Sequence, residues 1–336
     1  MPHILTITMN PAIDVSTSVE RVAHTQKLRC GPARRDPGGG GINAGRVAER
    51  LGSTVTAIFP AGGSTGQLLR RLVDEENLCG VAIPIQEETR QDFTAFETST
   101  GKQFRFVLSG PPLSELEWLK CLDEFVVFRT PVDFLVLSGS LPPGVPTEFY
   151  ARIAEIARSR AVPVALDASG PSLKAAVDHG VDILKPNLRE LRELTGKPLA
   201  DGASCAEACQ ELLAAGKARI IALTLGHRGA LLVTRDGAWH AGPLPILAVS
   251  TVGAGDSFLG AMVWALASGL STEDSFRYGV AGGSAALLAP GTQLCRAADV
   301  RGLFERVVLE PLTQRLPIEL GASFGSEHLS MAEDEL

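Results

Sequence analysis

The chain has 336 residues, of which 45% are hydrophobic and 21% are charged, and its formal net charge at pH 7 is −7. This length suffices for one large domain or two smaller ones, and the composition is ordinary for a soluble globular protein. The acidic balance excludes general nucleic-acid binding, which needs a basic face, but it allows an anionic substrate held by a few local cations.

The first residues, MPHILTITMNPAID, lack the basic segment and long apolar core of a signal peptide. No run of 18 or more apolar residues occurs, so we expect no membrane span. The cysteines stand at positions 30, 79, 121, 205, 209 and 295, with no paired metal-binding spacing. We therefore expect reduced thiols and a cytoplasmic protein.

Segments with the patterns of strands and helices alternate over most of the chain. The predicted strands lie at residues 3–8, 53–63, 132–140, 162–169, 181–187 and 218–226, and the predicted helices at 42–52, 65–77, 146–161 and 206–218. Repeated strand–helix units indicate a mainly parallel sheet with helices on both faces. Ligands of such sheets gather at the carboxyl ends of the strands.

Residues 89–110, TRQDFTAFETSTGKQFRFVLSG, alternate polar and apolar residues around a Ser-Thr-Gly turn, which predicts a β-hairpin. With residues 14–37 this region, from about 86 to 110, is predicted to form a small sheet outside the main one. A hairpin with one apolar face needs cover. We therefore expect a lid that also joins two copies into a homodimer, within a domain of residues 1–309. Residues 310–336 have the composition of a flexible tail.

Two clusters have residue types that bind hydroxyl and phosphate groups. PGGGGIN, residues 37–43, combines glycines that allow close backbone approach with Asn43, whose amide both donates to and accepts from hydroxyls. The alternative is a flexible loop capped by Asn43. The basic cluster contains Lys27, Arg29, Arg90 and Arg105. Guanidinium groups bind phosphate with two parallel hydrogen bonds, although any one of these cations alone fits a solvated surface charge.

KPNLRELREL, residues 185–194, places Asn187 and Glu190 on one side of a helix start. Their oxygens suit Mg²⁺, which usually keeps several waters and a substrate phosphate. The same spacing is that of a capping box, so both interpretations stay open.

STVGAGDSFLGAM, residues 250–262, leads small residues into a predicted helix with Asp256 in its first turn. A helix start binds anions through free N–H groups and the helix dipole, and an exposed carboxylate there can also simply complement the dipole. Phe258 occupies the third glycine position of a dinucleotide fingerprint, and no GxxxxGK[ST] motif occurs. Both facts argue against a Rossmann or P-loop site.

Together these clusters resemble the PfkB (ribokinase-like) family of carbohydrate kinases over residues 1 to about 305. GGGGINAGRVAERLG is similar to the N-terminal signature of the family, and STVGAGDSFLGAM to its highly specific C-terminal one. KLRC, IFPAGG, LSGSLPPGV, KPN and GTQLC are typical of the phosphosugar branch, most similar to the minor bacterial type of 6-phosphofructokinase. The resemblance implies a three-layer α/β sandwich with a mainly parallel central sheet and a small β-sheet lid.

The resemblance also implies an activity: transfer of the γ-phosphate of ATP to the 1-hydroxyl of fructose 6-phosphate. Asp256 would be the general base, and the N–H groups of Gly253, Ala254 and Gly255 the anion hole. The sugar phosphate would be held by Asp14, Lys27, Gly39, Asn43, Arg90, Arg105 and Ser140. The ATP site would be lined by Lys185, Asn187, Thr224, Gly226, Thr251 and Ser284. Asn187 and Glu190 would position Mg²⁺ through water, and K⁺ would lie in the loops around Ser250, Val252, Ala286 and Gly291.

Two positions depart from the pattern of the family. Ser250 stands where many relatives outside this branch carry Asp, and Asp92 is acidic where relatives often have a neutral residue. Asp92 is expected to pair with Arg90 and weaken its hold on phosphate.

Other activities stay open at this stage. 1-Phosphofructokinase and tagatose-6-phosphate kinase are close relatives of the same branch. Outside the kinases, an oxidoreductase using the glycine-rich turn and a non-catalytic sugar-phosphate sensor are the alternatives. The missing third glycine opposes the first, and the intact Asp256 with its two flanking glycines opposes the second.

Overall fold

The structure is a computed structural model, and it describes residues 1–312. One sheet is formed by β1 (His3–Ile7), β4 (Thr54–Gly62), β5 (Cys79–Ile85), β8 (Phe134–Ser138), β9 (Val164–Asp167), β10 (Ile183–Leu184), β11 (Ile220–Thr224), β12 (Ala230–Thr234), β13 (Gly237–Ala241) and β14 (Leu309–Pro311). A second sheet is formed by β2 (Ala12–Val19), β3 (Arg34–Gly38), β6 (Arg90–Glu97) and β7 (Gln103–Phe106).

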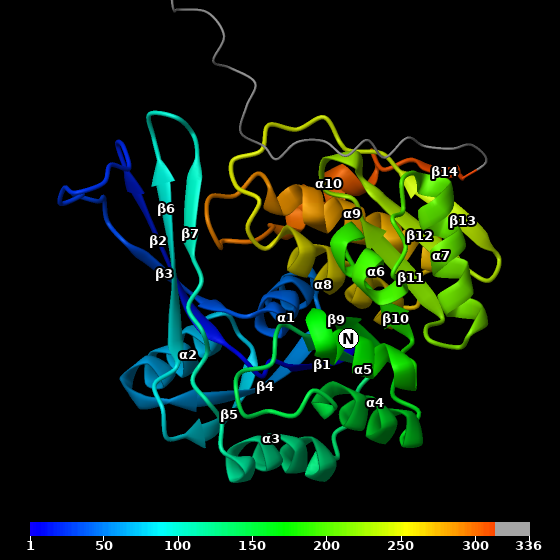
Figure 1. Cartoon of the computed structure of the whole chain (residues 1–336), viewed down its shortest axis with the longest axis horizontal. Helices are drawn as coiled ribbons and strands as arrows, with labels where there is room; N and C mark the ends of the chain where they lie inside the picture. The colour runs from blue at the N-terminus through cyan, green and yellow to red at the C-terminus, as the bar shows by residue number, and fades with distance from the viewer. Residues whose placement is uncertain (313–336) are drawn as a thin grey trace, which may run out of the picture.

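The helices are α1 (Gly40–Leu51), α2 (Gly63–Glu75), α3 (Glu115–Val127), α4 (Phe149–Ser159), α5 (Gly170–His179), α6 (Leu188–Thr195), α7 (Gly202–Ala214), α8 (Ala254–Ala267), α9 (Thr272–Ala286) and α10 (Ala297–Phe304), with a 3₁₀ turn, η1, at Gly226–Arg228. Single helices lie between successive strands in much of the large sheet, whereas α8, α9 and α10 follow one another (Figure 1).

The large sheet has the strand order β14-β13-β12-β11-β10-β9-β8-β1-β4-β5. Strands from β5 to β11 pair in parallel, whereas β12, β13 and β14 continue the sheet antiparallel at one edge. Because the parallel strands run in one direction, their carboxyl ends meet at one edge of the sheet, where the predicted site residues end up.

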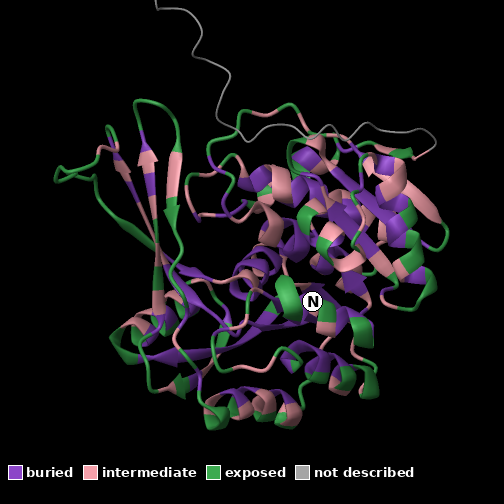
Figure 2. Cartoon of the chain, viewed as in Figure 1, coloured by how far each residue is buried: buried purple, intermediate pink, exposed green. Residues whose placement is uncertain are grey.

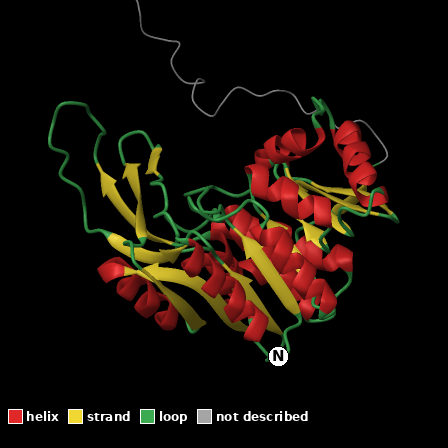
Figure 3. Ribbon diagram, turned by 60° about the horizontal axis from the view of Figure 1, so that its bottom comes forward, coloured by secondary structure: helices red, strands yellow, loops and turns green. Residues whose placement is uncertain are grey.

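Two hydrophobic cores lie on opposite faces of the large sheet. Successive side chains of a strand point to opposite faces, so Leu5 joins the core under α3, α4, α5 and α7, and Ile4 joins the core under α1, α8 and α9. The turned view shows helices on both sides of the strands (Figure 3). The predicted three-layer α/β architecture with a mainly parallel sheet is confirmed.

The small sheet stands beside the large one, with many exposed positions toward its free end (Figures 1 and 2). Its strand order is β3-β2-β6-β7, in which β2 pairs with β6 in parallel and both outer pairs are antiparallel. β6 and β7 form the predicted hairpin, and β2 and β3 come from the predicted partner segment. The two lid segments thus form one sheet, as the alternating pattern indicated.

The end of the domain differs from the prediction. Glu310 and Pro311, expected in the tail, belong to β14, which pairs with β13 at the edge of the large sheet. Backbone pairing rather than a hydrophobic pattern holds this short strand, so composition gave no signal for it. The rest of the predicted tail, 313–336, lies outside the described residues.

The six cysteines are free, and four of them are buried: Cys121, Cys205, Cys209 and Cys295. Among residues 1–312, no helix is both long and apolar enough to cross a membrane.

Candidate active site

The amino end of α8 forms the centre of the site. Gly253 precedes the helix with φ +73°, a left-handed conformation that glycine adopts without strain, and a Cβ there would lie 2.4 Å from a side-chain carbon of Leu294. The N–H groups of the first turn have no partner within the helix. The residues predicted to form the anion site, Gly253, Ala254 and Gly255, thus lie at this helix start, with Asp256 in the same turn.

Asp256 is tied to the glycine-rich segment. The side-chain amide of Asn43 donates a hydrogen bond of 2.9 Å to Oδ2 of Asp256. Burial, and then the negative charge of Asp167, raises the pKa of Asp256 to about 6, against the lowering effects of Asn43, Lys185 and Arg105. Near neutral pH the carboxylate is therefore mostly ionised and sufficiently basic to accept a proton.

The glycine-rich segment forms the start of α1. Gly39 precedes the helix with φ +108°, and its side-chain position is closed by Thr8 and Pro11. Asn43 lies inside the helix with 5% of its surface exposed, so it does not cap the loop. The alternative of a flexible loop capped by Asn43 is wrong, because Gly39 occupies the capping position and Asn43 points to Asp256.

The small sheet adds charged side chains to this centre. Asp14 on β2 has a pKa raised to about 7, first by burial and then by Asp92, while Arg105 lowers it. The positive charge of Arg105, on β7, lowers the pKa of both Asp14 and Asp256. Arg90 pairs with Asp92, as expected from the sequence.

Lys27 differs from Arg90, whose side chain is largely buried. It is exposed on the connection between β2 and β3, and within residues 1–312 it makes none of the contacts that join the rest of the site. Arg29 is also exposed on this connection.

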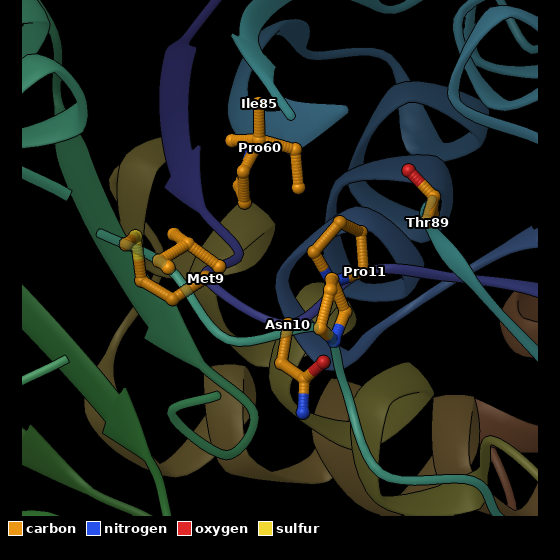
Figure 4. A pocket seen from close by; sticks show the side chains of 8 residues that line it. Met9, Asn10, Pro11, Pro60, Ile85 and Thr89 are labelled. Carbon is orange, nitrogen blue, oxygen red and sulfur yellow. The ribbon is translucent and has the colours of Figure 1, made fainter. Parts of the chain in front are cut away.

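Asn10, which the sequence analysis did not single out, connects two predicted residues. Its side-chain amide donates to Oγ of Ser140 over 3.1 Å, and its backbone carbonyl accepts a 3.1 Å hydrogen bond from Arg90. Figure 4 shows its side chain turned away from Pro60 and Ile85, which line the same small pocket. Asn10 lies three residues after the end of β1, and a polar residue near the carboxyl end of a parallel strand is the signal that points to it.

A second group of predicted residues surrounds Lys185. Its Nζ lies 2.9 Å from a carboxylate oxygen of Asp167, and both side chains are largely buried. A Cβ on Gly255 would lie 3.5 Å from the same Nζ, so Lys185 reaches the anion site at α8. Asp167 ends β9 and was missed, although its place at a strand end is again the signal.

Asn187 and Glu190 form a capping box at the start of α6. The N–H of Glu190 donates to Oδ1 of Asn187 over 2.9 Å, and the N–H of Asn187 donates to Glu190 over 2.8 Å. Burial, and to a lesser extent Asp167, raises the pKa of Glu190. Thr224, the last residue of β11, forms an isolated parallel β-bridge with Asn187. Among residues 1–312 no three His, Cys, Asp or Glu side chains are grouped to hold a metal ion directly.

The predicted cation loops lie against each other. The N–H groups of Val249 and Ser250 both donate to the carbonyl of Leu287, one residue after Ala286. The Ser250 hydroxyl lies 3.5 Å from the carbonyl of Gly291, and it accepts a hydrogen bond from the N–H of Val252. The structure thus brings Ser250, Val252, Ala286 and Gly291 into one region.

Two of the remaining residues that were predicted to line the ATP site are exposed at the surface. Gly226 and Thr251 are exposed, at the start of η1 and just before α8. Ser284 lies on α9, where its neighbour Gly283 packs against the carbonyl of Ala254.

An arginine within α1, Arg46, was also missed. Its side chain has no exposed surface, yet it contacts Glu76, Thr292, Pro37 and Asn43. Its partners outside α1 come from β3, from the residue after α2 and from the loop after α9, so the local pattern of α1 carries no signal for its burial.

A family model, pfkB family carbohydrate kinase, matches residues 5–299 of this sequence. The chain belongs to the pfkB family of carbohydrate kinases. The family resemblance inferred from the two signatures is therefore confirmed.

Named members of the family are similar over nearly the whole chain. The ATP-dependent 6-phosphofructokinase isozyme 2 of Mycobacterium tuberculosis is 46% identical over 90% of this chain and 89% of its own length. The enzyme of the same name from Escherichia coli is 39% identical over 90% of this chain and 98% of its own. The 1-phosphofructokinase of Bacillus subtilis is 30% identical over 84% of this chain and 91% of its own length.

Solved structures from the family agree with the fold. The phosphofructokinase-2 of Escherichia coli in complex with fructose-6-phosphate superposes with a TM-score of 0.86 at 36% identity, covering 91% of this chain and 99% of that one. The same enzyme in complex with potassium gives a TM-score of 0.87 at 38% identity, with the same coverage. The chain is thus a pfkB-family kinase in sequence and in fold.

Proposed function

We propose that this chain is an ATP-dependent 6-phosphofructokinase, which transfers the γ-phosphate of ATP to the 1-hydroxyl of fructose 6-phosphate. The observation that carries the proposal is the meeting of Asp256, at the amino end of α8, with Asn43 and with the charged residues of the small sheet. The names of the relatives from Mycobacterium tuberculosis and Escherichia coli support the same activity.

Asp256 acts as the general base. It takes the proton from the 1-hydroxyl while that oxygen attacks the γ-phosphorus, and the bond to the β-phosphate oxygen of ATP breaks. The free N–H groups at Gly253, Ala254 and Gly255 stabilise the charge on the transferring phosphoryl group. Asn43 orients the carboxylate of Asp256, and Lys185 adds a positive charge beside the anion site.

Mg²⁺ fits the residues around Lys185 as a water-bound ion. The negative charge of Asp167 raises the pKa of both Glu190 and Asp256, so the three carboxylates repel one another there. A divalent cation relieves such repulsion, and Mg²⁺ keeps several of its waters when few carboxylates are offered. Asn187 and Glu190 would hold it through water, although the single side-chain oxygen of Asn187 and one carboxylate oxygen of Glu190 also accept hydrogen bonds in the capping box. When bound, the ion would neutralise charge on the ATP phosphates.

K⁺ is proposed in the loops that carry Ser250, Val252, Ala286 and Gly291. Backbone carbonyls and the Ser250 hydroxyl are the oxygen ligands that this region offers. The potassium complex of the related Escherichia coli enzyme supports the proposal.

The sugar phosphate is held between the two sheets. Asp14, Gly39, Asn43 and Ser140 face the sugar hydroxyls, and Arg90 and Arg105 bind the 6-phosphate. Lys27 joins them only if the exposed connection between β2 and β3 moves toward the site, or reaches the site of a second copy. We place the protein in the cytoplasm, where ATP and sugar phosphates are available.

The small sheet is the proposed dimer surface. Phe106, Val107 and Leu108 are 55%, 60% and 56% exposed, and the ring of Phe93 lies 6.2 Å from that of Phe106 on the same hairpin. Apolar side chains gathered on one sheet favour a protein contact. Light scattering tests this proposal: the chain should be a dimer, and Phe106→Asp should shift it toward the monomer.

A coupled assay of ADP release tests the function. With ATP and Mg²⁺, turnover should be highest on fructose 6-phosphate within a panel that includes fructose 1-phosphate, tagatose 6-phosphate and free fructose. A preference for fructose 1-phosphate would favour the activity named for the Bacillus subtilis relative. Turnover confined to a free sugar would refute the phosphate site.

A further inference from the structure

The pair formed by Arg90 and Asp92 lies inside the proposed phosphate site. A carboxylate oxygen of Asp92 lies 3.1 Å from Nη1 of Arg90, and the two side chains are only 11% and 14% exposed. Because water screens a largely buried pair poorly, the negative charge of Asp92 cancels much of the positive charge that Arg90 offers to an anion.

Asp92 is also fixed in place by the backbone. Its Oδ1 accepts a 3.0 Å hydrogen bond from the N–H of Leu108, and Arg90 Nη1 donates to the carbonyl of the same residue over 2.9 Å. The carboxylate therefore cannot swing away from Arg90 without breaking a contact across the end of the hairpin.

Arg90 nevertheless keeps donors for a ligand. Nη1 is used by Asp92 and Leu108, and Nη2 gives one hydrogen bond to Asn10. Nε is buried and has no hydrogen-bond partner among residues 1–312. The second N–H of Nη2 thus remains for an anion, although the charge of Arg90 is already balanced by Asp92.

The same carboxylate acts on the sugar side of the site. Asp92 stands directly opposite Asp14 in the parallel pairing of β2 and β6. After burial, Asp92 is the largest cause of the raised pKa of Asp14. One side chain therefore influences both the phosphate-binding cation and a sugar-binding carboxylate.

We propose that Asp92 determines how tightly this enzyme holds the phosphate of its substrate, by balancing the charge of Arg90 while leaving one side of the guanidinium for the anion. The inference rests on the proposed function, because it assigns the substrate phosphate to Arg90. Asp92 weakens binding of the sugar phosphate and leaves the transfer step to Asp256.

Asp92→Asn is the test, since it removes the charge and keeps both the volume and the oxygen that accepts from Leu108. The KM for fructose 6-phosphate should fall about three- to tenfold, with kcat within about twofold and the KM for ATP unchanged. Asp236→Asn, at an exposed turn after β12, is the matched control and should change none of these values. An unchanged or higher KM for fructose 6-phosphate would overturn the proposal.

A double-mutant cycle shows whether the effect passes through Arg90. In an Arg90→Met background, Asp92→Asn should no longer lower the KM for fructose 6-phosphate. Retention of the full gain there would also overturn the proposal.

The function and the inference fail in different ways. Absence of turnover on fructose 6-phosphate by the unmodified protein would refute the function. Calorimetric titration with inorganic phosphate, in the presence of a non-hydrolysable ATP analogue, then tests the pair directly. Phosphate should bind more tightly to Asp92→Asn than to the unmodified chain, and equal affinity would refute the inference.

Discussion

The side-chain amide of Asn43 and the carboxylate of Asp256 are joined by a 2.9 Å hydrogen bond, although 213 positions separate them in the sequence. This contact connects the two family signatures, because Asn43 lies on α1 and Asp256 lies in the first turn of α8. A donor on the ionised form stabilises that form, so Asn43 keeps Asp256 available as a base despite its burial.

Replacement of the proposed base tests its role most directly. Asp256→Asn keeps the shape of the side chain but cannot accept the proton, so kcat should fall by about 10²- to 10⁴-fold. Binding of ATP, measured by calorimetry, should change little, because the N–H groups at the start of α8 remain. Turnover near that of the unmodified enzyme would rule out Asp256 as the base.

The titration of Asp14 predicts a pH-dependent stability. Its pKa in the folded protein is about 7, above the ordinary value of 3.8, so the folded state binds this proton more tightly than the unfolded state does. Ionisation therefore costs stability, and the cost grows from about pH 4 to about pH 7 and then stays constant.

Asp14→Asn should remove this cost. The stability of the variant relative to the unmodified chain should rise by roughly 1–3 kcal/mol between about pH 4.5 and about pH 7.5. Urea titrations at several pH values measure this difference. A difference that does not vary with pH would show that Asp14 has an ordinary pKa.

The buried arginine of α1 is expected to be important for stability. Arg46 lies 2.6 Å from Glu76, and its guanidinium has no exposed surface. Arg46→Met should cost about 3–5 kcal/mol, because it leaves Glu76 and the buried Asp36 without this cation. Arg50→Met removes a quarter-exposed partner of the same Glu76 and should cost less. Equal losses in urea titrations would contradict a special role for the buried position.

The contact between α1 and α8 depends on a glycine. A Cβ on Gly260 would lie 2.4 Å from the carbonyl oxygen of Ala44 and 3.0 Å from Cβ of Val47. Gly260→Ala should force the helices apart and cost about 1–3 kcal/mol. Gly302→Ala, on α10 with open space around it, should instead stabilise by about 0.5–1 kcal/mol. Thermal unfolding separates the two, and a neutral Gly260→Ala would show that the helices adjust.

Much of the architecture follows from local patterns. The apolar strands followed by amphipathic helices predict the parallel sheet, and the polar–apolar alternation of residues 89–110 predicts the hairpin of β6 and β7. Both patterns arise because each element must bury one face. The capping box of Asn187 and Glu190 is equally local, since it needs only a spacing of three residues at a helix start.

Other features depend on long-range contacts that no local pattern encodes. Asp167 belongs to the site because β9 lies next to β10 and Lys185 follows β10. Arg46 is buried because Glu76 and the carbonyl of Thr292 reach it from distant segments. The last strand, β14, exists because the edge of β13 offers it backbone partners.

The sequence alone therefore determined which residue types can bind phosphate, accept a proton and cap a helix, since these are properties of side chains and short spacings. Tertiary structure decided which of them act together. It set the pKa of Asp256 through burial and distant charges, it left Lys27 exposed, and it placed Asp92 opposite Asp14. Electrostatic strength depends on distance and on exclusion of water, and both arise only when the chain has folded.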